Sequence, residues 1–210
     1  MPPKTISRVV VIGDHGVGKT NLINQFINER IEDEEYKSTI GIELYRKPGF
    51  RLRRDHDSGQ EDNREVKGKE SPDTVNFEII ECRPSECVNT RRDWVYARMS
   101  VIVAMYSVTS ILSLKRARSI LAEARKKAFE GKVFLVGILA DAQDQREVTR
   151  EDGGALAREF GVDYSELSVR DAAAVEDLFQ IIARFAPVKE ERVVKEDTSM
   201  WGGLWKGFWS

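Results

Sequence analysis

The sequence predicts an α/β domain with a mainly parallel six-stranded sheet and helices on both faces. Strand-like apolar runs alternate with amphipathic helical patterns along most of the chain, an order typical of parallel strands joined by helical crossovers. The first run, VVVI at positions 9–12, leads into a glycine-rich loop and then a helix. With 210 residues, the chain has room for one domain of ordinary size and a tail.

The expected elements follow from these runs, taken in chain order. Short apolar runs predict strands, and apolar residues three or four positions apart predict helices, as at Leu22, Ile23, Phe26 and Ile27. We expect strands at residues 8–12, 42–46, 75–81, 100–108, 133–139 and 163–165. We expect helices at residues 19–29, 89–97, 111–130, 149–160 and 172–185.

Residues 48–73 do not fit this alternation. Between Arg51 and Pro72 the chain carries six basic and six acidic residues and almost nothing apolar. Such a segment buries too little surface to order itself, so we expect a solvated insertion between two strands. A specific docking arm is the alternative. The folded domain is then expected over residues 1–187 and the tail over residues 188–210.

Charge and composition exclude several classes of function. The 33 basic and 35 acidic residues give a net charge of -2, which offers no overall attraction to nucleic acid. The sequence has no apolar run of eighteen residues and no signal-peptide pattern, so we expect a cytoplasmic protein. We expect Cys82 and Cys87 to stay reduced there, and His15 and His56 are too few for a zinc-type site.

A complete phosphate-binding motif, G-x-x-x-x-G-K-[ST], follows the first predicted strand. Its residues are Gly13, Asp14, His15, Gly16, Val17, Gly18, Lys19 and Thr20. The glycines let the backbone N–H groups converge on phosphate oxygens, and the following helix adds the positive end of its dipole. Lys19 supplies a positive charge and Thr20 a hydroxyl for Mg²⁺, so the motif predicts a nucleotide-phosphate site.

Several motifs in the same order resemble the Ras superfamily of small GTPases, and most closely its Rab branch, over residues 6–187. They are the phosphate loop and residues 36–43, 103–109, 146–149 and 155–161. The resemblance implies a Rab-like G domain over residues 1–187, with GTP or GDP and Mg²⁺ as cofactors. It also implies that Thr20 and the switch I threonine, Thr39, approach Mg²⁺ and that Thr39 senses the γ-phosphate.

The segment that matches the family's D-x-x-G-Q switch II motif is degenerate. Glu81 replaces the aspartate that holds Mg²⁺ through water, which keeps the charge on a longer side chain. Pro84 replaces the glycine whose N–H reaches the γ-phosphate, and proline has no N–H to donate. Ser85 replaces the glutamine that orients the attacking water and is too short for that role, although Glu86 is an alternative.

His15 occupies a loop position where Rab proteins usually have serine. A bulky imidazole there crowds the space of an arginine finger and of the catalytic water. We interpret His15 as a surface residue that obstructs this space, with a functional histidine near the phosphates as the alternative.

The base-recognition motif of the family, N-K-x-D, stands here as ILAD, residues 138–141. Asp141 can still accept the guanine N–H groups, but Ile138 cannot hydrogen-bond and Leu139 lacks an ammonium group. The family's S-A-K turn is matched by Ser168, Val169 and Arg170, where a backbone N–H can still reach the guanine oxygen. We therefore expect phosphate affinity with reduced guanine selectivity.

The last residues form an aromatic segment over residues 200–209. Its apolar side chains share one helical face: Trp201, Leu204, Trp205, Phe208 and Trp209. So short a segment, with three glycines, should fold only on a protein groove or a membrane interface, or by packing back on its own domain. No cysteine follows Cys87, so we expect no prenylation.

These features favour a pseudo-GTPase or a very slow GTPase. We expect it to act by nucleotide-modulated or constitutive binding of a protein effector or complex subunit, in membrane traffic or in a ciliary or cytoskeletal assembly. A peripheral membrane or cytoskeletal position is then the alternative to a purely cytoplasmic one. The rival hypothesis is a genuine GTP-hydrolysing switch, and a metabolic P-loop kinase is disfavoured because it does not explain the segment around Thr39.

Overall fold

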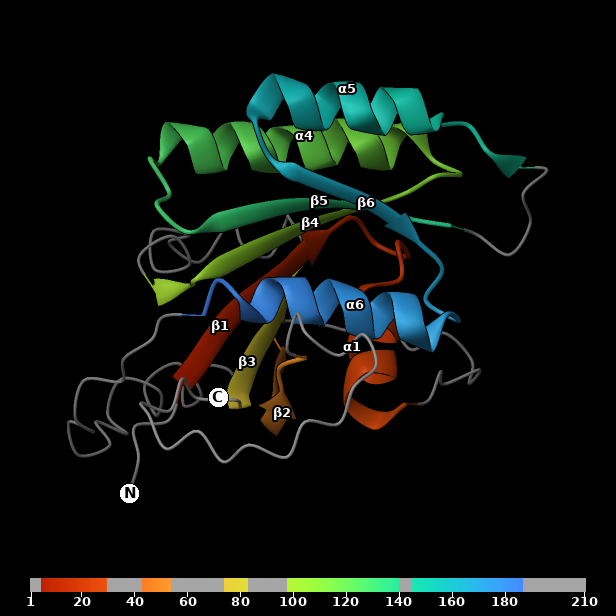
Figure 1. Cartoon of the computed structure of the whole chain (residues 1–210). Coiled ribbons are helices and arrows are strands. Elements are labelled where there is room, and N and C mark those ends of the chain that lie inside the picture. The colour runs from red at the N-terminus through yellow and green to blue at the C-terminus, as the bar shows by residue number, and fades with distance from the viewer. Residues whose placement is uncertain (1–4, 30–42, 54–73, 83–97, 140–144, 187–210) are drawn as a thin grey trace, which may run out of the picture.

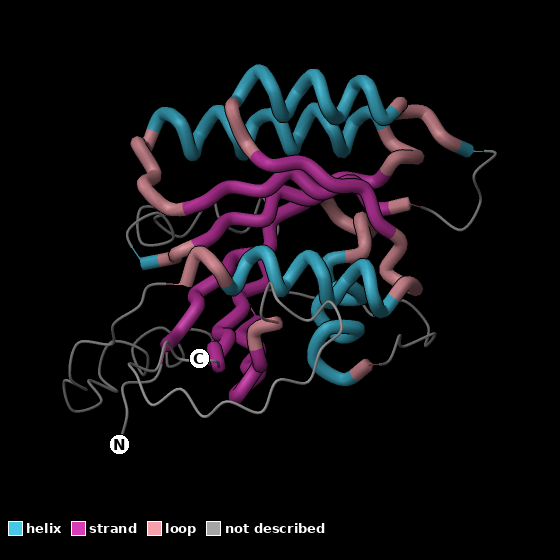
Figure 2. Tube along the Cα trace, viewed as in Figure 1, coloured by secondary structure: helices cyan, strands magenta, loops and turns pink. Residues whose placement is uncertain are grey.

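The protein has a six-stranded sheet between two helical layers (Figures 1 and 2). This computed structural model describes residues 5–29, 43–53, 74–82, 98–139 and 145–186. The strands are β1 (Thr5–Gly13), β2 (Glu43–Arg51), β3 (Thr74–Cys82), β4 (Val101–Ser107), β5 (Lys132–Ile138) and β6 (Asp163–Leu167). The helices are α1 (Lys19–Asn28), α4 (Ile111–Lys126), α5 (Arg150–Phe160) and α6 (Ala172–Ala183).

The sheet is parallel except at one edge. Its order is β2-β3-β1-β4-β5-β6, and β2 runs antiparallel to β3. Figure 1 shows α4 and α5 on one face of the sheet and α1 and α6 on the other. The predicted architecture, a mainly parallel six-stranded sheet with helices on both faces, is thus confirmed. Because these strands are parallel, the carboxyl ends of β1, β3, β5 and β6 lie at one edge of the sheet.

Alternation along β1 divides the core into two clusters. Val9 and Val11 face α1 and α6, whereas Val10 and Ile12 face α4 and α5. The first cluster contains an aromatic group made of Phe26, Phe50, Phe77 and Phe179. Such ring pairs contribute about 0.5–1.5 kcal/mol each beyond their buried area, which holds α1 and α6 firmly against the sheet.

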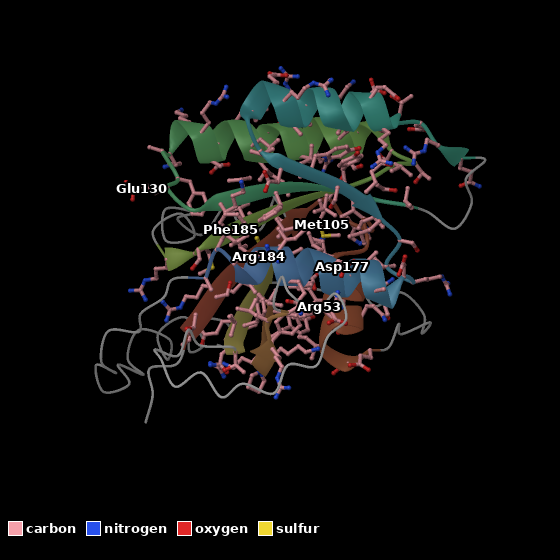
Figure 3. All side chains as sticks on the ribbon, viewed as in Figure 1. Arg53, Met105, Glu130, Asp177, Arg184 and Phe185 are labelled. Carbon is pink, nitrogen blue, oxygen red and sulfur yellow. The ribbon has the colours of Figure 1, made fainter. Side chains whose placement is uncertain are left out.

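β2 is longer than the sequence predicts, and its last residues correct the expected start of the insertion. Residues 48–51 belong to the strand, because a register shift between Lys47 and Phe50 turns Phe50 into the core. Beyond β2, Arg53 forms an ion pair with Glu176 at 2.8 Å. It forms a second with Asp177 at 2.5 Å, and Figure 3 labels these two residues. The rest of the predicted insertion lies outside the described residues.

Other element boundaries differ by a few residues. β1 begins at Thr5, before the predicted start, and β6 continues to Leu167 because it pairs with β5 through Ile138. Helix α4 ends at Lys126 rather than at residue 130, since Ala128 has a left-handed backbone with φ 49°. The predicted helix at residues 89–97 and the aromatic segment 200–209 lie outside the described residues. Within the described residues, no helix has the length and apolarity needed to cross a membrane.

A buried polar network links β4, β6 and the segment before α5. The hydroxyl of Tyr106 lies 3.0 Å from that of Tyr164, and both reach the Glu166 carboxylate, at 3.3 and 2.7 Å. Arg146 donates two hydrogen bonds to the same carboxylate. Burial would raise the pKa of Glu166, but the hydrogen bonds from Arg146 and Tyr164 lower it below its ordinary value. The network therefore holds an ionised carboxylate.

This network predicts opposite effects for two adjacent glycines of α5. A Cβ at Gly153 would overlap the hydroxyls of Tyr106 and Tyr164, whereas at Gly154 the nearest atom, Nη1 of Arg158, is 3.4 Å away. Gly153→Ala should lower the free energy of unfolding by about 1–3 kcal/mol through overpacking. Gly154→Ala should raise it by up to about 1 kcal/mol, because alanine favours helices. Urea titration measures both, and equal effects would contradict the packing described here.

Candidate phosphate-binding site

The glycine-rich loop connects β1 to α1 in a conformation that needs its glycines. Gly16 and Gly18 have φ of 74° and 91°, in the left-handed region that side chains rarely adopt. A Cβ at Gly13 would lie 2.7 Å from the carbonyl oxygen of Met105 on β4 and 2.9 Å from Val17. The chain can therefore turn sharply from the central strand into α1, whose N-terminus points into the loop.

Lys19, the first residue of α1, lies across this loop. Its ammonium donates a 2.8 Å hydrogen bond to the carbonyl oxygen of Asp14, and its side chain is buried. A buried ammonium attracts anions strongly, because little water screens it. The role predicted for Lys19, a positive charge that binds phosphate, stays a prediction.

Thr20 and Glu81 bring oxygen ligands together beside Lys19. The Thr20 hydroxyl donates to the Glu81 carboxylate, with Oγ1 at 2.8 Å from Oε1 and 3.1 Å from Oε2. Glu81 is 3 % exposed at the end of β3. Burial raises the pKa of Glu81, and this rise is opposed by the Thr20 hydrogen bond and by the charge of Lys19. A hydroxyl and a carboxylate in one place suit a hard cation such as Mg²⁺.

Tyr45 is a member of this group that the sequence analysis missed. Its hydroxyl lies 2.5 Å from Oε2 of Glu43, to which it donates, and 3.3 Å from Oε2 of Glu81. The two glutamates are direct cross-strand partners on β2 and β3, so the hydroxyl separates two like charges. Burial raises the pKa of Tyr45 far above its ordinary value, which keeps it a neutral donor. Glu81, whose side chain is longer than that of the family's aspartate, thus has the hydroxyls of Thr20 and Tyr45 as partners.

The second missed residue is Arg116 on α4, which reaches the phosphate loop from outside. Its Nη1 lies 2.7 Å from Oδ1 of Asp14, and the backbone N–H of His15 donates to the same oxygen at 2.8 Å. His15 itself is exposed. Periodicity placed Arg116 on a helix, but no pattern in the sequence indicated that this helix face meets the loop.

The base-recognition side of the site is apolar. Ile138 ends β5 and is 6 % exposed, packed in the core cluster beneath α6. A Cβ built at Gly18 would lie 3.6 Å from Ile138 and 3.9 Å from Val169, so both side chains border the end of the phosphate loop. Leu139 packs on the opposite face, in the cluster beneath α4 and α5, as strand alternation requires. Neither Ile138 nor Leu139 has a side-chain hydrogen-bonding group to offer a base.

The turn after β6 completes the described part of this side. Ser168 Oγ accepts the backbone N–H of Arg170 at 3.2 Å, and Asp171 caps α6 by accepting the N–H of Ala174. Ser168, Val169 and Arg170 directly follow Leu167, whose carbonyl oxygen accepts the backbone N–H of Leu139 after β5 at 2.9 Å.

Four of the predicted site residues, Thr39, Pro84, Ser85 and Asp141, lie outside the described residues. Cys82, buried at the end of β3, is disulfide-bonded, so the expectation that it stays reduced is wrong. The other cysteine of the chain, Cys87, also lies outside the described residues.

Comparison with known proteins gives consistent matches. A model of the Ras family matches residues 8–187. Ras-related protein Rab5 of Nicotiana tabacum is 29 % identical over 182 residues, covering 86 % of this chain and 81 % of the relative. Ras-related protein RIC1 of Oryza sativa is 30 % identical over 177 residues, covering 84 % and 78 %. GTP-binding protein ypt5 of Schizosaccharomyces pombe is 27 % identical over 186 residues, covering 88 % and 79 %. The family match runs from β1 through α6 and spans the candidate site.

The burial of Glu81 predicts a pH dependence of stability in metal-free protein. Because its pKa is raised in the folded state, the folded protein binds this proton more tightly than the unfolded chain does. Stability should therefore fall as the pH rises above the ordinary carboxyl value of 4.5. Glu81→Gln keeps an acceptor for Thr20 but cannot ionise, so it should lose less stability over that range, by up to about 1.4 kcal/mol per pH unit.

The measurement is urea unfolding at several pH values between 4.5 and 7.5 in the presence of EDTA. Wild type and Glu81→Gln should diverge as the pH rises. Parallel curves would show that burial does not disfavour the Glu81 carboxylate.

Proposed function

Because this chain belongs to the Ras family of small GTPases and is Rab-like, we propose that it binds nucleotides mainly through their phosphates and Mg²⁺ and hydrolyses them very slowly or not at all. It would act by presenting its surface to protein partners, in a nucleotide-modulated or constitutive way. Ras and Rab proteins bind guanine nucleotide and protein effectors. We propose that this chain differs from them in base selectivity and in the rate of hydrolysis.

The contrast between the two halves of the site carries the proposal. On the phosphate side, Lys19 donates across a glycine loop at 2.8 Å and Thr20 donates to Glu81 at 2.8 Å. On the base side, the buried Ile138 packs near Gly18 in place of the family's asparagine. A site that hydrogen-bonds a base rejects analogues strongly, whereas an apolar pocket discriminates only weakly. Phosphate affinity with relaxed base selectivity follows.

The residues that are present suit Mg²⁺. The Thr20 hydroxyl and the Glu81 carboxylate are adjacent hard oxygens, and Thr39 would join them if it acts as its family position implies. Among the described residues no group of three or more acidic, histidine or cysteine side chains is placed to hold a metal, so nucleotide oxygens and waters would complete the shell. When bound, Mg²⁺ neutralises charge on the β- and γ-phosphates.

Slow hydrolysis is proposed from the residues that follow β3. Pro84 has no N–H for the γ-phosphate, and a hydrogen bond to a charged group is typically worth about 1.5–3 kcal/mol. Ser85 is too short to orient water from the glutamine position. We therefore propose that Glu81, Pro84 and Ser85 are degenerate, and we assign no catalytic residue.

Partner binding is the proposed output. The candidate contact is the aromatic segment 200–209, which can bind a protein groove or a membrane interface. Traffic, ciliary or cytoskeletal assemblies, in the cytoplasm or peripheral on a membrane, remain the proposed settings, by analogy at the level of the fold.

One observation favours the second candidate, a genuine GTP-hydrolysing switch. Thr20 donates a hydrogen bond to Glu81, so an acidic group lies beside the hydroxyl that would bind Mg²⁺, although the glutamate side chain is longer than the family's aspartate. In that case other residues would replace the functions lost at Pro84 and Ser85.

Base selectivity can be measured directly. Isothermal titration of nucleotide-free protein with GTP, GDP and ATP in Mg²⁺ should give affinities for GTP and ATP that differ by less than about 3 kcal/mol, or roughly two decades. Lys19→Ala should weaken the binding of GTP and ATP by the same factor, because it removes a phosphate contact. Tight binding confined to guanine nucleotides would contradict relaxed selectivity, and no binding at all would leave a nucleotide-independent scaffold.

The rate of hydrolysis can also be measured. A single-turnover assay with GTP should give a rate on the order of 10⁻⁴ per second or slower, near the slow intrinsic rate of Ras. A rate about a hundredfold faster that Lys19→Ala abolishes would favour the genuine switch instead.

A further inference from the structure

The phosphate loop contains one acidic residue, whose backbone carbonyl and side-chain carboxylate each contact a cation. Between Gly13 and Thr20, Asp14 is the sole carboxylic acid. Its carbonyl oxygen accepts the Lys19 ammonium at 2.8 Å, and its carboxylate lies 2.7 Å from the guanidinium of Arg116. The Asp14 side chain is 18 % exposed and that of Arg116 is 48 % exposed. A single residue therefore links the lysine of the loop to a cation on α4.

A carboxylate in this position opposes the binding of polyphosphate. The backbone carbonyl of Asp14 holds the ammonium that the motif assigns to phosphate, and the carboxylate of the same residue brings a negative charge into the loop that would take the anion. Charges this close interact appreciably where the surroundings are partly buried. The backbone N–H of His15 also donates to the Asp14 carboxylate, but this neutral donor does not cancel the negative charge of Asp14.

We propose that Arg116 is an electrostatic positioning residue of the phosphate loop: its guanidinium neutralises Asp14 and thereby allows the loop to accept a polyphosphate anion. The inference rests on the proposed phosphate binding and deepens it, because it assigns part of the affinity to a residue outside the motif. Arg116 acts through Asp14 and is not assigned a contact with the nucleotide.

The start of α4 is built to hold Arg116 in this place. Ser110 caps the helix by accepting the N–H of Ser113, and the Ser113 hydroxyl donates to the carbonyl of Ser107 at the end of β4. Ser107 in turn donates its own N–H to the Ser113 hydroxyl at 3.0 Å. These bonds tie the first turns of α4 to β4, the strand next to β1, and so place Arg116 beside the loop.

The same helix offers a matched control. Arg118 lies two positions further on, on a different side of α4, and pairs with Glu159 of α5 at 2.5 Å. Replacing either arginine removes one positive charge from the protein, but only Arg116 lies at the loop.

A purely mechanical tether would behave differently from charge neutralisation. If the ion pair mattered only as a link, Arg116→Gln and Asp14→Asn would each break it and each would weaken binding. If charge matters, the two substitutions have opposite signs, because Asp14→Asn removes the repulsive group. The double variant then restores the net charge of wild type at the loop.

The test is calorimetric titration of the full chain with inorganic pyrophosphate and with GDP, both in Mg²⁺. Arg116→Gln should weaken pyrophosphate binding about three- to tenfold, and tenfold corresponds to about 1.4 kcal/mol. Asp14→Asn should strengthen binding by a similar factor, and the double variant should lie between the two. Arg116→Lys should retain most of the affinity, and Arg118→Gln should bind like wild type. Raising the salt concentration should shrink the effects at Arg116 and Asp14. Thermal midpoints verify that each variant is folded.

The outcomes separate the inference from the function on which it rests. If wild type binds pyrophosphate and GDP but Asp14→Asn weakens binding as Arg116→Gln does, the pair is only a tether and the inference is wrong. The same holds if Arg118→Gln weakens binding as much as Arg116→Gln. If wild type binds neither ligand, the proposed phosphate binding itself fails, and the inference fails with it.

Discussion

The parallel pairing of β1 with β3 and β4 is the constraint on which the rest of this structure depends. It aligns Ile12 with Cys82 and Gly13 with Met105, so the ends of three strands lie side by side. The phosphate loop must leave β1 at that level, and Glu81 on β3 is then within hydrogen-bonding distance of Thr20. A shift of one residue would turn the Glu81 side chain to the other face of the sheet and separate the two groups.

The charged side chains of the site are buried and therefore need hydrogen-bond partners. Lys19 and Glu81 are both buried, and isolated buried charges are costly unless they have hydrogen-bond partners. Lys19 uses a loop carbonyl, whereas Glu81 uses the hydroxyls of Thr20 and Tyr45. Because little water screens charges in such surroundings, each charge changes the affinity for an anion. We infer that Arg116 does so by neutralising Asp14.

The two sides of the candidate site differ in chemistry because they end different strands. The loop after β1 is polar and its backbone conformation requires glycine, whereas β5 ends in the apolar pair Ile138 and Leu139. The sheet holds both at the same edge. The packing that positions Ile138 does not require a polar side chain there, so the family architecture is compatible with an apolar residue at this position.

The sequence alone determined the class of sheet, the phosphate loop and the identities of Lys19, Thr20 and Glu81, because periodicity and motif spacing are local properties. It did not reveal that β2 continues through Arg51, since the register shift that buries Phe50 depends on pairing with β3. Nor did it reveal Tyr45 and Arg116 as neighbours of Glu81 and Asp14. These contacts join residues 36 and 102 positions apart. Only the strand register and the direction in which a helix packs bring such residues together, and tertiary structure decides both.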